Sequence, residues 1–361
     1  MKKTLVALAV AAAAVAGTAN AAVIYEQDGA KVELSGSLRM FLGKVGDERG
    51  DLKNDGSRVY VKVRQDLGNG LSALAGYQIR FTEKPDNQQE ANKGSESDWG
   101  EPSTRELYAG LAHKDIGTLT FGRQQTTADD VLQDATYYRS GAYNILTTRS
   151  DKSVKFKSAE WNGFAFGADY LFGHPDTKAG SSAATSFNPE YKNGFGLTAF
   201  YHYDLAEDQK LEFAAGYTQD NYDDHNISND NLQKNKAWLL HGSYTYGPLY
   251  LALNYGQTKN AYRNSVALVT DKDEKGRYAM VDARYQFSEP SAVFAQWERL
   301  DSRVDGQDVT DEIKNRYQVG VDYKLHKNVI TYAMYERENT KDSSGETQKD
   351  NIYGVGLRVF F

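Results

Sequence analysis

The 361-residue chain contains no cysteine, and this absence excludes disulfides, zinc–thiolate sites and a cysteine nucleophile. Proline is scarce, with 6 residues, and positive charge is not in excess, because 42 Lys and Arg stand against 49 Asp and Glu. Proteins that bind nucleic acid usually present a basic surface. No nucleic-acid partner is therefore expected.

A long apolar run is missing everywhere except at the N-terminus. Met1-Lys2-Lys3 is basic, Thr4 to Gly17 is apolar, and Ala19-Asn20-Ala21 is a small-x-small triplet, which together indicate an export signal. We predict that residues 1–21 are removed as a signal peptide and that residues 22–361 form a single domain. Without the two signal lysines, 40 basic residues face 49 acidic ones, a net charge of −9. Downstream there is no run of the roughly twenty apolar residues that a membrane helix needs.

Alternation of apolar and polar side chains is the main positive feature, together with 32 Gly and 25 Tyr. In the last eleven residues, one face is wholly apolar and consists of Tyr353, Val355, Leu357, Val359 and Phe361. A period of two is that of a strand with two different faces. Segments of this kind recur along the chain, with aromatic residues near their ends. The pattern is typical of a membrane β-barrel, whose low mean hydropathy, here −0.65, comes from polar lumen and loop residues.

Short and long connections alternate between these segments. Seven short turns, among them the Asn69-Gly70 hairpin signal, alternate with eight long polar connections. The long connections are residues 43–56, 82–103, 123–150, 173–193, 219–236, 257–276, 300–315 and 338–350. We therefore predict an all-β, 16-stranded antiparallel transmembrane β-barrel with short periplasmic turns and long extracellular loops. Because no open sheet edge is tolerated in lipid, we expect closure, with Ala22 to Tyr25 added to the last strand. A soluble β-sandwich, lectin or propeller would not show this asymmetry.

The predicted lumen carries basic side chains on its early strands. A barrel of this size is too wide to be filled by its own side chains, so it encloses water. Like charges on one wall need opposing acids or ions. Residues 123–150 are the best source of such acids, with Asp129, Asp130 and Asp134 and a possible helix start at Thr127. This connection is also more apolar than the others, so we expect it to fold into the lumen. The alternative is a loop that caps the outer rim.

One position disagrees with the alternation. If Arg105 faces the lumen, Glu106 faces outward, where a carboxylate in lipid is costly. Glu106 is therefore interpreted either as the mark of a contact between subunits or as a sign that the local register is misassigned.

Several motifs taken together resemble the general trimeric porins of Gram-negative outer membranes, most closely the Pasteurella-type major porins. They span the mature chain and are Tyr25–Gly29, Val32–Ser37, Gly70–Ala75, Leu107–Leu111, Ile116–Arg123, Phe156–Gly163, Asp322–Lys327 and the terminal Phe361. The resemblance implies a homotrimer, a third loop folded inward as a constriction, and contact with outer-membrane lipid and lipopolysaccharide. Phe361 resembles the signal that the outer-membrane assembly machinery reads.

The resemblance also implies where the constriction lies. Flanking motifs align Arg58, Arg105 and Arg149 with arginines of the family, and Arg39, Lys62 and Arg80 extend this basic wall. The enteric porins carry a Pro-Glu-Phe-Gly-Gly-Asp run in the third loop, whereas this chain has Ser140-Gly141-Ala142-Tyr143 near that place. Asp129, Asp130 and Asp134 are the acids expected instead.

The expected function is a water-filled outer-membrane channel for passive diffusion of ions and small hydrophilic solutes. We expect no catalysis, cofactor or metal. An enzyme would need a nucleophile beside one of the six histidines, and none is evident. A channel specific for sugars or phosphate would need aromatic residues along the lumen or lysines at the constriction. The acidic residues of the 219–236 connection do not have calcium-loop spacing. Adhesion or recognition through the long loops is compatible with any of these functions.

Overall fold

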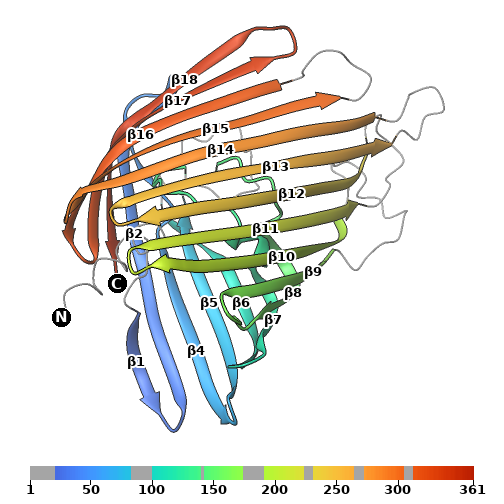
Figure 1. Cartoon of the computed structure of the whole chain (residues 1–361), viewed down its shortest axis with the longest axis vertical. Helices are drawn as coiled ribbons and strands as arrows, with labels where there is room; N and C mark the ends of the chain where they lie inside the picture. Colours follow the sequence, from blue (N-terminus) through green and yellow to red (C-terminus); the bar gives the residue numbers. More distant parts are fainter. Residues whose placement is uncertain are drawn as a thin grey trace.

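The computed structural model describes residues 21–82, 100–139, 142–173, 191–222, 231–263, 272–304 and 312–361. The predicted signal peptide lies outside the described residues except for Ala21. In the described segments the chain forms one antiparallel sheet (Figure 1). Its strands are β1 (Ala22–Gln27), β2 (Ala30–Val45), β3 (Asp51–Asn54), β4 (Arg58–Gly68), β5 (Leu71–Thr82), β6 (Glu101–His113), β7 (Gly117–Gln125), β8 (Arg149–Ser158), β9 (Phe164–Phe172), β10 (Tyr191–Ala206), β11 (Gln209–Tyr222), β12 (Asn231–Tyr246), β13 (Leu249–Arg263), β14 (Lys272–Ser288), β15 (Ser291–Val304), β16 (Glu312–His326), β17 (Val329–Asp342) and β18 (Thr347–Phe360).

The sheet closes because β18 pairs with β2, from Ile352 opposite Val45 to Phe360 opposite Ser37. The two short strands β1 and β3 do not add to the number of strands around the barrel. β3 and β4 follow one another along the same edge of β2. β1 pairs with the part of β2 that extends beyond β18, so β18 and β1 follow one another along the same edge of β2, as expected for Ala22 to Tyr25. The pairing of β18 with β2 is by itself sufficient to close the barrel. The described residues thus form a closed 16-strand barrel, and the predicted fold class is confirmed.

The seven predicted short turns all connect neighbouring strands. At the β4–β5 turn, Asn69 and Gly70 have φ angles of 53° and 79°, the left-handed conformation that such hairpins require. The predicted long connection at 338–350 is wrong, because β17 runs to Asp342 and β18 begins at Thr347. At these strand ends both faces are polar, so the alternation disappears while the hydrogen-bonded ladder continues.

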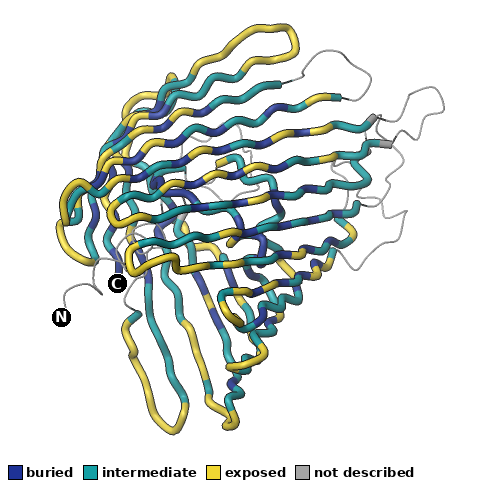
Figure 2. Tube along the Cα trace, viewed as in Figure 1, coloured by how far each residue is buried: buried dark blue, intermediate teal, exposed yellow. Residues whose placement is uncertain are grey.

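Burial is the reverse of that in a water-soluble protein. Leu253 and Leu325 on the outer face are 62% and 61% exposed, whereas Asp282, Glu298 and Arg316 on the inner face are 0% exposed. Figure 2 shows the resulting alternation of buried and exposed positions along the strands. The barrel therefore has an apolar exterior and a polar interior, as the alternating pattern predicts.

Candidate functional site

In the connection between β7 and β8, the described residues 126–139 and 142–148 fold into the barrel, and they are called the internal loop. It begins with a single 3-10 turn, η1 (Thr127–Asp130), at the helix start suggested by the sequence. The backbone N–H of Thr127 donates to Oδ2 of Asp169 on β9 at 2.9 Å. Glycine makes this approach possible, because a Cβ at Gly167 would lie 2.5 Å from the Thr127 methyl group. The start of the loop is thus fixed to the lumen wall.

Apolar side chains hold the two limbs of the internal loop, before and after its tip, against the wall. Val131 and Leu146 pack in one cluster with Leu239 and Met280 on the inner face of β12 and β14. A Cβ at Gly216 on β11 would meet both loop residues, at 3.0 and 2.8 Å. The loop is therefore seated in a strip of the lumen that is apolar and locally hollowed by glycine.

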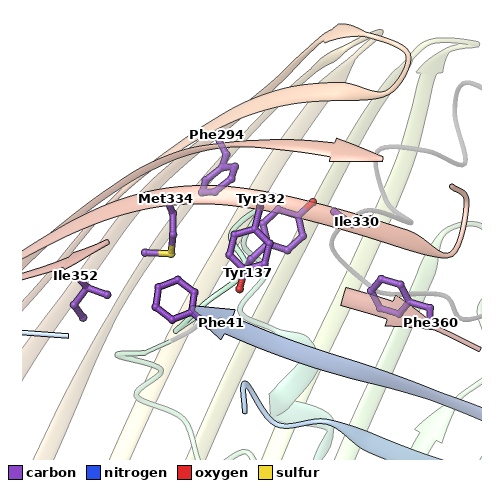
Figure 3. Packing of buried hydrophobic residues seen from close by; sticks show 8 residues of the cluster. All are labelled: Phe41, Tyr137, Phe294, Ile330, Tyr332, Met334, Ile352 and Phe360. Carbon is purple, nitrogen blue, oxygen red and sulfur yellow. The ribbon is translucent and has the colours of Figure 1, made fainter. Parts of the chain in front are cut away.

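The tip of the internal loop carries two tyrosines that stack on aromatic residues of the wall. Figure 3 shows the first of them, Tyr137, beside Tyr332. Tyr137 stacks on Tyr332 of β17, with ring centroids 4.7 Å apart and planes 13° apart. Tyr138 stacks on Phe41 of β2 at 4.1 Å and 7°. Phe294 of β15 meets the edge of Tyr137 at 5.6 Å. These contacts carry the loop across the lumen to the wall opposite its origin.

Ion pairs complete this tip anchor, which we define as Tyr137, Tyr138, Arg139 and their wall partners. Arg139 reaches Glu336 at 2.7 Å and Glu338 at 2.8 Å. Arg316, which is 0% exposed, lies 2.5 Å from Glu298 and 3.0 Å from Glu336.

The loop backbone also joins the anchor. Gln318 donates to the carbonyl of Tyr138 at 3.1 Å, and Arg358 donates to that of Tyr137 at 2.7 Å. Sequence reasoning missed this anchor. The available signal was that inner positions such as Phe294, Tyr332 and Ile352 are apolar where a lumen position should be polar.

A cluster of guanidinium groups lies on the wall from which the internal loop departs. The structure brings together Arg39, Arg58, Arg80, Arg105 and Arg149, which we call the arginine cluster; neighbouring members repel one another electrostatically. Lys62 lies farther along β4, with its ammonium over the Tyr60 ring at 4.7 Å from the centroid. Of the six predicted wall residues, the structure groups the arginines and leaves the lysine apart.

A β-bulge explains the disagreement at Glu106. Gln78 pairs with Glu106 and Ile79 with Thr104, so Arg105 is an extra residue without a partner on β5. Arg105 and Glu106 consequently both face the lumen. Glu106 is 4% exposed and accepts a hydrogen bond from the Tyr60 hydroxyl at 3.0 Å. The interpretation of Glu106 as an outward-facing subunit contact is wrong, and the alternative of a misassigned register is confirmed.

The three predicted loop acids occupy different environments. Asp129 interacts electrostatically with Arg105 and Arg149; burial raises the pKa of its carboxyl above the ordinary value, and Arg105 opposes that rise. Asp130 is exposed and pairs with Lys157 at 2.6 Å. Asp134 is 3% exposed and lies against the other wall.

Asp282 and Glu298 of that other wall interact electrostatically with Asp134. Only Asp129, among the three predicted loop acids, thus faces the arginine cluster. The arrangement in the described part of the chain is a lumen crossed by an anchored loop, with one carboxylate opposite several guanidinium groups.

A closed barrel with an apolar exterior, a polar interior and a loop across its lumen defines the class of transmembrane β-barrel channels. Comparison with known proteins then identifies the family. The chain matches the Gram-negative porin family over residues 7–343, and it belongs to that family. Membership places the protein in the outer membrane of a Gram-negative cell as a channel for small solutes.

Curated relatives and solved structures agree with this assignment. Two major outer membrane proteins of Pasteurella multocida are 38% and 37% identical to the chain, each over 100% of both sequences. OmpF of Salmonella typhi, solved with daunomycin, has a TM-score of 0.68 at 20% identity, covering 94% of this chain and all of that one. An anion-selective porin from Comamonas acidovorans has a TM-score of 0.67 at 16% identity, covering 92% of this chain and all of that one. At these identities the solved structures support the fold alone.

The described segments contain no group of three or more His, Asp or Glu side chains that could hold a metal ion. No helix in them is long and apolar enough to cross a membrane.

Proposed function

We propose that ions and small hydrophilic solutes diffuse through a constriction bounded by the arginine cluster on one side and, on the other, by Asp129 of the internal loop beside the ion pair of Asp130 with Lys157. The observation that carries this proposal is that Asp129, in the first turn of the internal loop, interacts electrostatically with Arg105 and Arg149 of the arginine cluster. Opposite charges across a narrow lumen orient water and disfavour apolar solutes, while the bore sets the size limit. The proposal involves no enzymatic step, cofactor or metal.

Single-channel conductance tests this proposal on residues 22–361 refolded into a planar bilayer. We expect open channels, and we expect Asp129→Asn and Asp130→Asn each to change the ion selectivity. Asp134→Asn is the matched control, because its side chain is buried against the wall and should leave selectivity unchanged. Barrels that insert but pass no current would contradict the channel, and equal effects of all three substitutions would contradict the constriction.

We further propose that the protein assembles as a homotrimer. Support comes from OmpT of Vibrio cholerae, solved in a trimer form, which has a TM-score of 0.65 at 18% identity, covering 92% of this chain and all of that one. In the same bilayer recordings a trimer should close in three equal steps. Closure in a single step by a species that sediments as a monomer would contradict it.

We infer that the outward rim contacts phosphate groups of outer-leaflet lipopolysaccharide. Lys236, Lys259, Lys275 and Arg303 follow one another in register across β12, β13, β14 and β15. Lys236 and Lys259 also line a pocket of about 610 Å³ together with Lys192 and Lys234. Basic side chains above an apolar, aromatic-rich surface suit an anionic lipid headgroup.

Replacement of this row tests the inference. The variant Lys236→Gln/Lys259→Gln/Arg303→Gln should retain less lipopolysaccharide in native mass spectrometry, whereas the lumen variant Arg64→Gln should retain as much as the parent. Equal retention by both variants would contradict a role for the row.

Two proposals concern export and assembly. We propose that residues 1–21 are cleaved as a signal peptide, leaving residues 22–361 as one domain, and that Phe361 is read by the outer-membrane assembly machinery. The first proposal predicts that the mass of the mature protein corresponds to a chain that begins at Ala22. Deletion of Phe361 should lower insertion into the outer membrane of cells more than it lowers refolding in detergent. Phe361 also has a structural contact, because its carbonyl accepts a hydrogen bond from the Gly36 N–H at 2.7 Å. An equal loss of insertion and refolding would therefore indicate a purely structural role.

A further inference from the structure

We propose that the constriction prefers anions, with small phosphorylated or carboxylated solutes as its favoured class, although the chain as a whole is acidic. The inference rests on the proposed constriction and adds the sign of its charge. Its basis is the pairing of charges around the arginine cluster, where guanidinium groups outnumber the carboxylates that face them.

The guanidinium groups of the arginine cluster have few protein partners. Arg39 donates through Nε to the Ser37 hydroxyl at 2.8 Å, and Arg58 donates through Nε to the carbonyl of Gly56 at 3.1 Å. Both acceptors are neutral. The Nε atoms of Arg80, Arg105 and Arg149 make no hydrogen bond within the segments that the structure describes. None of these contacts is made with a carboxylate, so none of them neutralises a guanidinium charge of the cluster.

Two nearby carboxylates are already neutralised by other cations. Asp130 lies 2.6 Å from Lys157. Asp55 lies 2.7 Å from Nη2 of Arg358. Each pair brings no net charge, so neither carboxylate compensates the arginine cluster.

Two further carboxylates are turned away from a passing solute. Glu106 is 4% exposed and accepts a hydrogen bond from Tyr60. Its charge offsets part of that of Arg105 and Arg149, so Glu106 and Asp129 are two carboxylates against the five guanidinium groups of the cluster. Asp134 is 3% exposed and lies against the opposite wall beside Asp282. Asp129 is left as the loop acid facing the cluster, and burial disfavours its charged form.

The other charged groups of the opposite wall are covered by the internal loop. Arg316, Glu298 and Glu336 are each 0% exposed and pair among themselves. Arg284 and Asp322 form a second buried pair at 2.5 Å. A solute at the constriction does not contact these groups.

The chemistry of the uncovered groups favours oxyanions. A guanidinium presents paired N–H donors that match carboxylate and phosphate oxygens. A lumen wall of one sign also concentrates the opposite ion locally. Acidic loops farther away contribute little, because salt screens charges beyond about 8–10 Å at physiological ionic strength. Selectivity thus follows the cluster and not the net charge of the chain.

Zero-current potentials across a KCl gradient test the inference, because K⁺ and Cl⁻ have similar mobilities in water. We expect the unmodified channel to be more permeable to Cl⁻ than to K⁺. Arg58→Gln, Arg80→Gln and Arg105→Gln should each lower the Cl⁻/K⁺ permeability ratio by about two- to fivefold, the range expected for one exposed charge pair. Arg64→Gln, a lumen substitution farther along β4 beside Ser72, is the matched control and should change the ratio less.

Inorganic phosphate provides a second readout. Added phosphate should reduce Cl⁻ current through the parent channel, and this block should weaken in Arg105→Gln and persist in Arg64→Gln. A conducting channel that prefers K⁺, or whose ratio responds equally to the cluster variants and the control, would overturn the anion preference while leaving the channel itself intact. A barrel that passes no current would refute the proposed function instead.

Discussion

Removing both tip tyrosines, in Tyr137→Ala/Tyr138→Ala, is expected to raise single-channel conductance by about twofold, since conductance follows the bore at the narrowest point. The two rings stack on Tyr332 and Phe41 and hold the internal loop across the lumen. Without them the loop loses its largest apolar contacts at the tip. Aromatic pairs contribute about 0.5–1.5 kcal/mol each beyond the area they bury.

The outward-facing tyrosines of β10 offer a matched control for this variant. Tyr201 and Tyr203 also stack, with centroids 6.5 Å apart and planes 12° apart, but they are 40% and 51% exposed on the outer face. Their double alanine variant should conduct like the parent channel. Unchanged conductance in Tyr137→Ala/Tyr138→Ala would show that the ionic contacts of Arg139 suffice to hold the tip.

Replacing Arg316 with methionine is expected to destabilise the folded barrel by about 3–5 kcal/mol, because it leaves buried carboxylates without a cation. Arg316 is 0% exposed and lies between Glu298 and Glu336, which are also 0% exposed. Glu298 lies on β15 and Glu336 on β17, the two strands that flank Arg316 on β16, so loss of the guanidinium leaves both carboxylates buried without their cation. The free energy of unfolding, measured in urea with the barrel in lipid vesicles, should fall accordingly.

Two further variants isolate the cause of that loss. Arg337→Met removes an outward-facing arginine from β17, where Arg337 bonds only to Asn339 among the described residues, and should cost much less. The triple variant Arg316→Met/Glu298→Gln/Glu336→Gln removes both the cation and the carboxylate charges, so it should recover most of the stability. A triple variant as unstable as Arg316→Met would mean that packing of the guanidinium, and not charge, is what matters.

Local sequence pattern was enough to predict the strands and the short turns. Alternation such as that of Tyr353, Val355 and Leu357 predicts strands with an apolar outer face, and the structure confirms them. It was not enough where the strands pass beyond the apolar belt. β17 and β18 continue through residues that the pattern interpreted as a loop, because the backbone ladder does not require alternation.

The same distinction between local pattern and tertiary contacts applies to the residues of the candidate site. The sequence by itself determined which side chains face the lumen on regular strands, including Arg39, Arg58 and Arg80, because side-chain direction follows from a period of two. Only the tertiary structure decided the direction of Glu106, since a one-residue bulge at Arg105 shifts every later side chain of the strand.

Tertiary structure alone also decided which loop acid faces the arginine cluster. Asp129 and Asp134 are close in sequence, yet one interacts with Arg105 and the other with Asp282. The reason is physical: the path of the internal loop depends on contacts with strands far away in sequence. Those contacts, such as Tyr137 with Tyr332, join residues that are nearly two hundred positions apart in the chain, so no local pattern contains them.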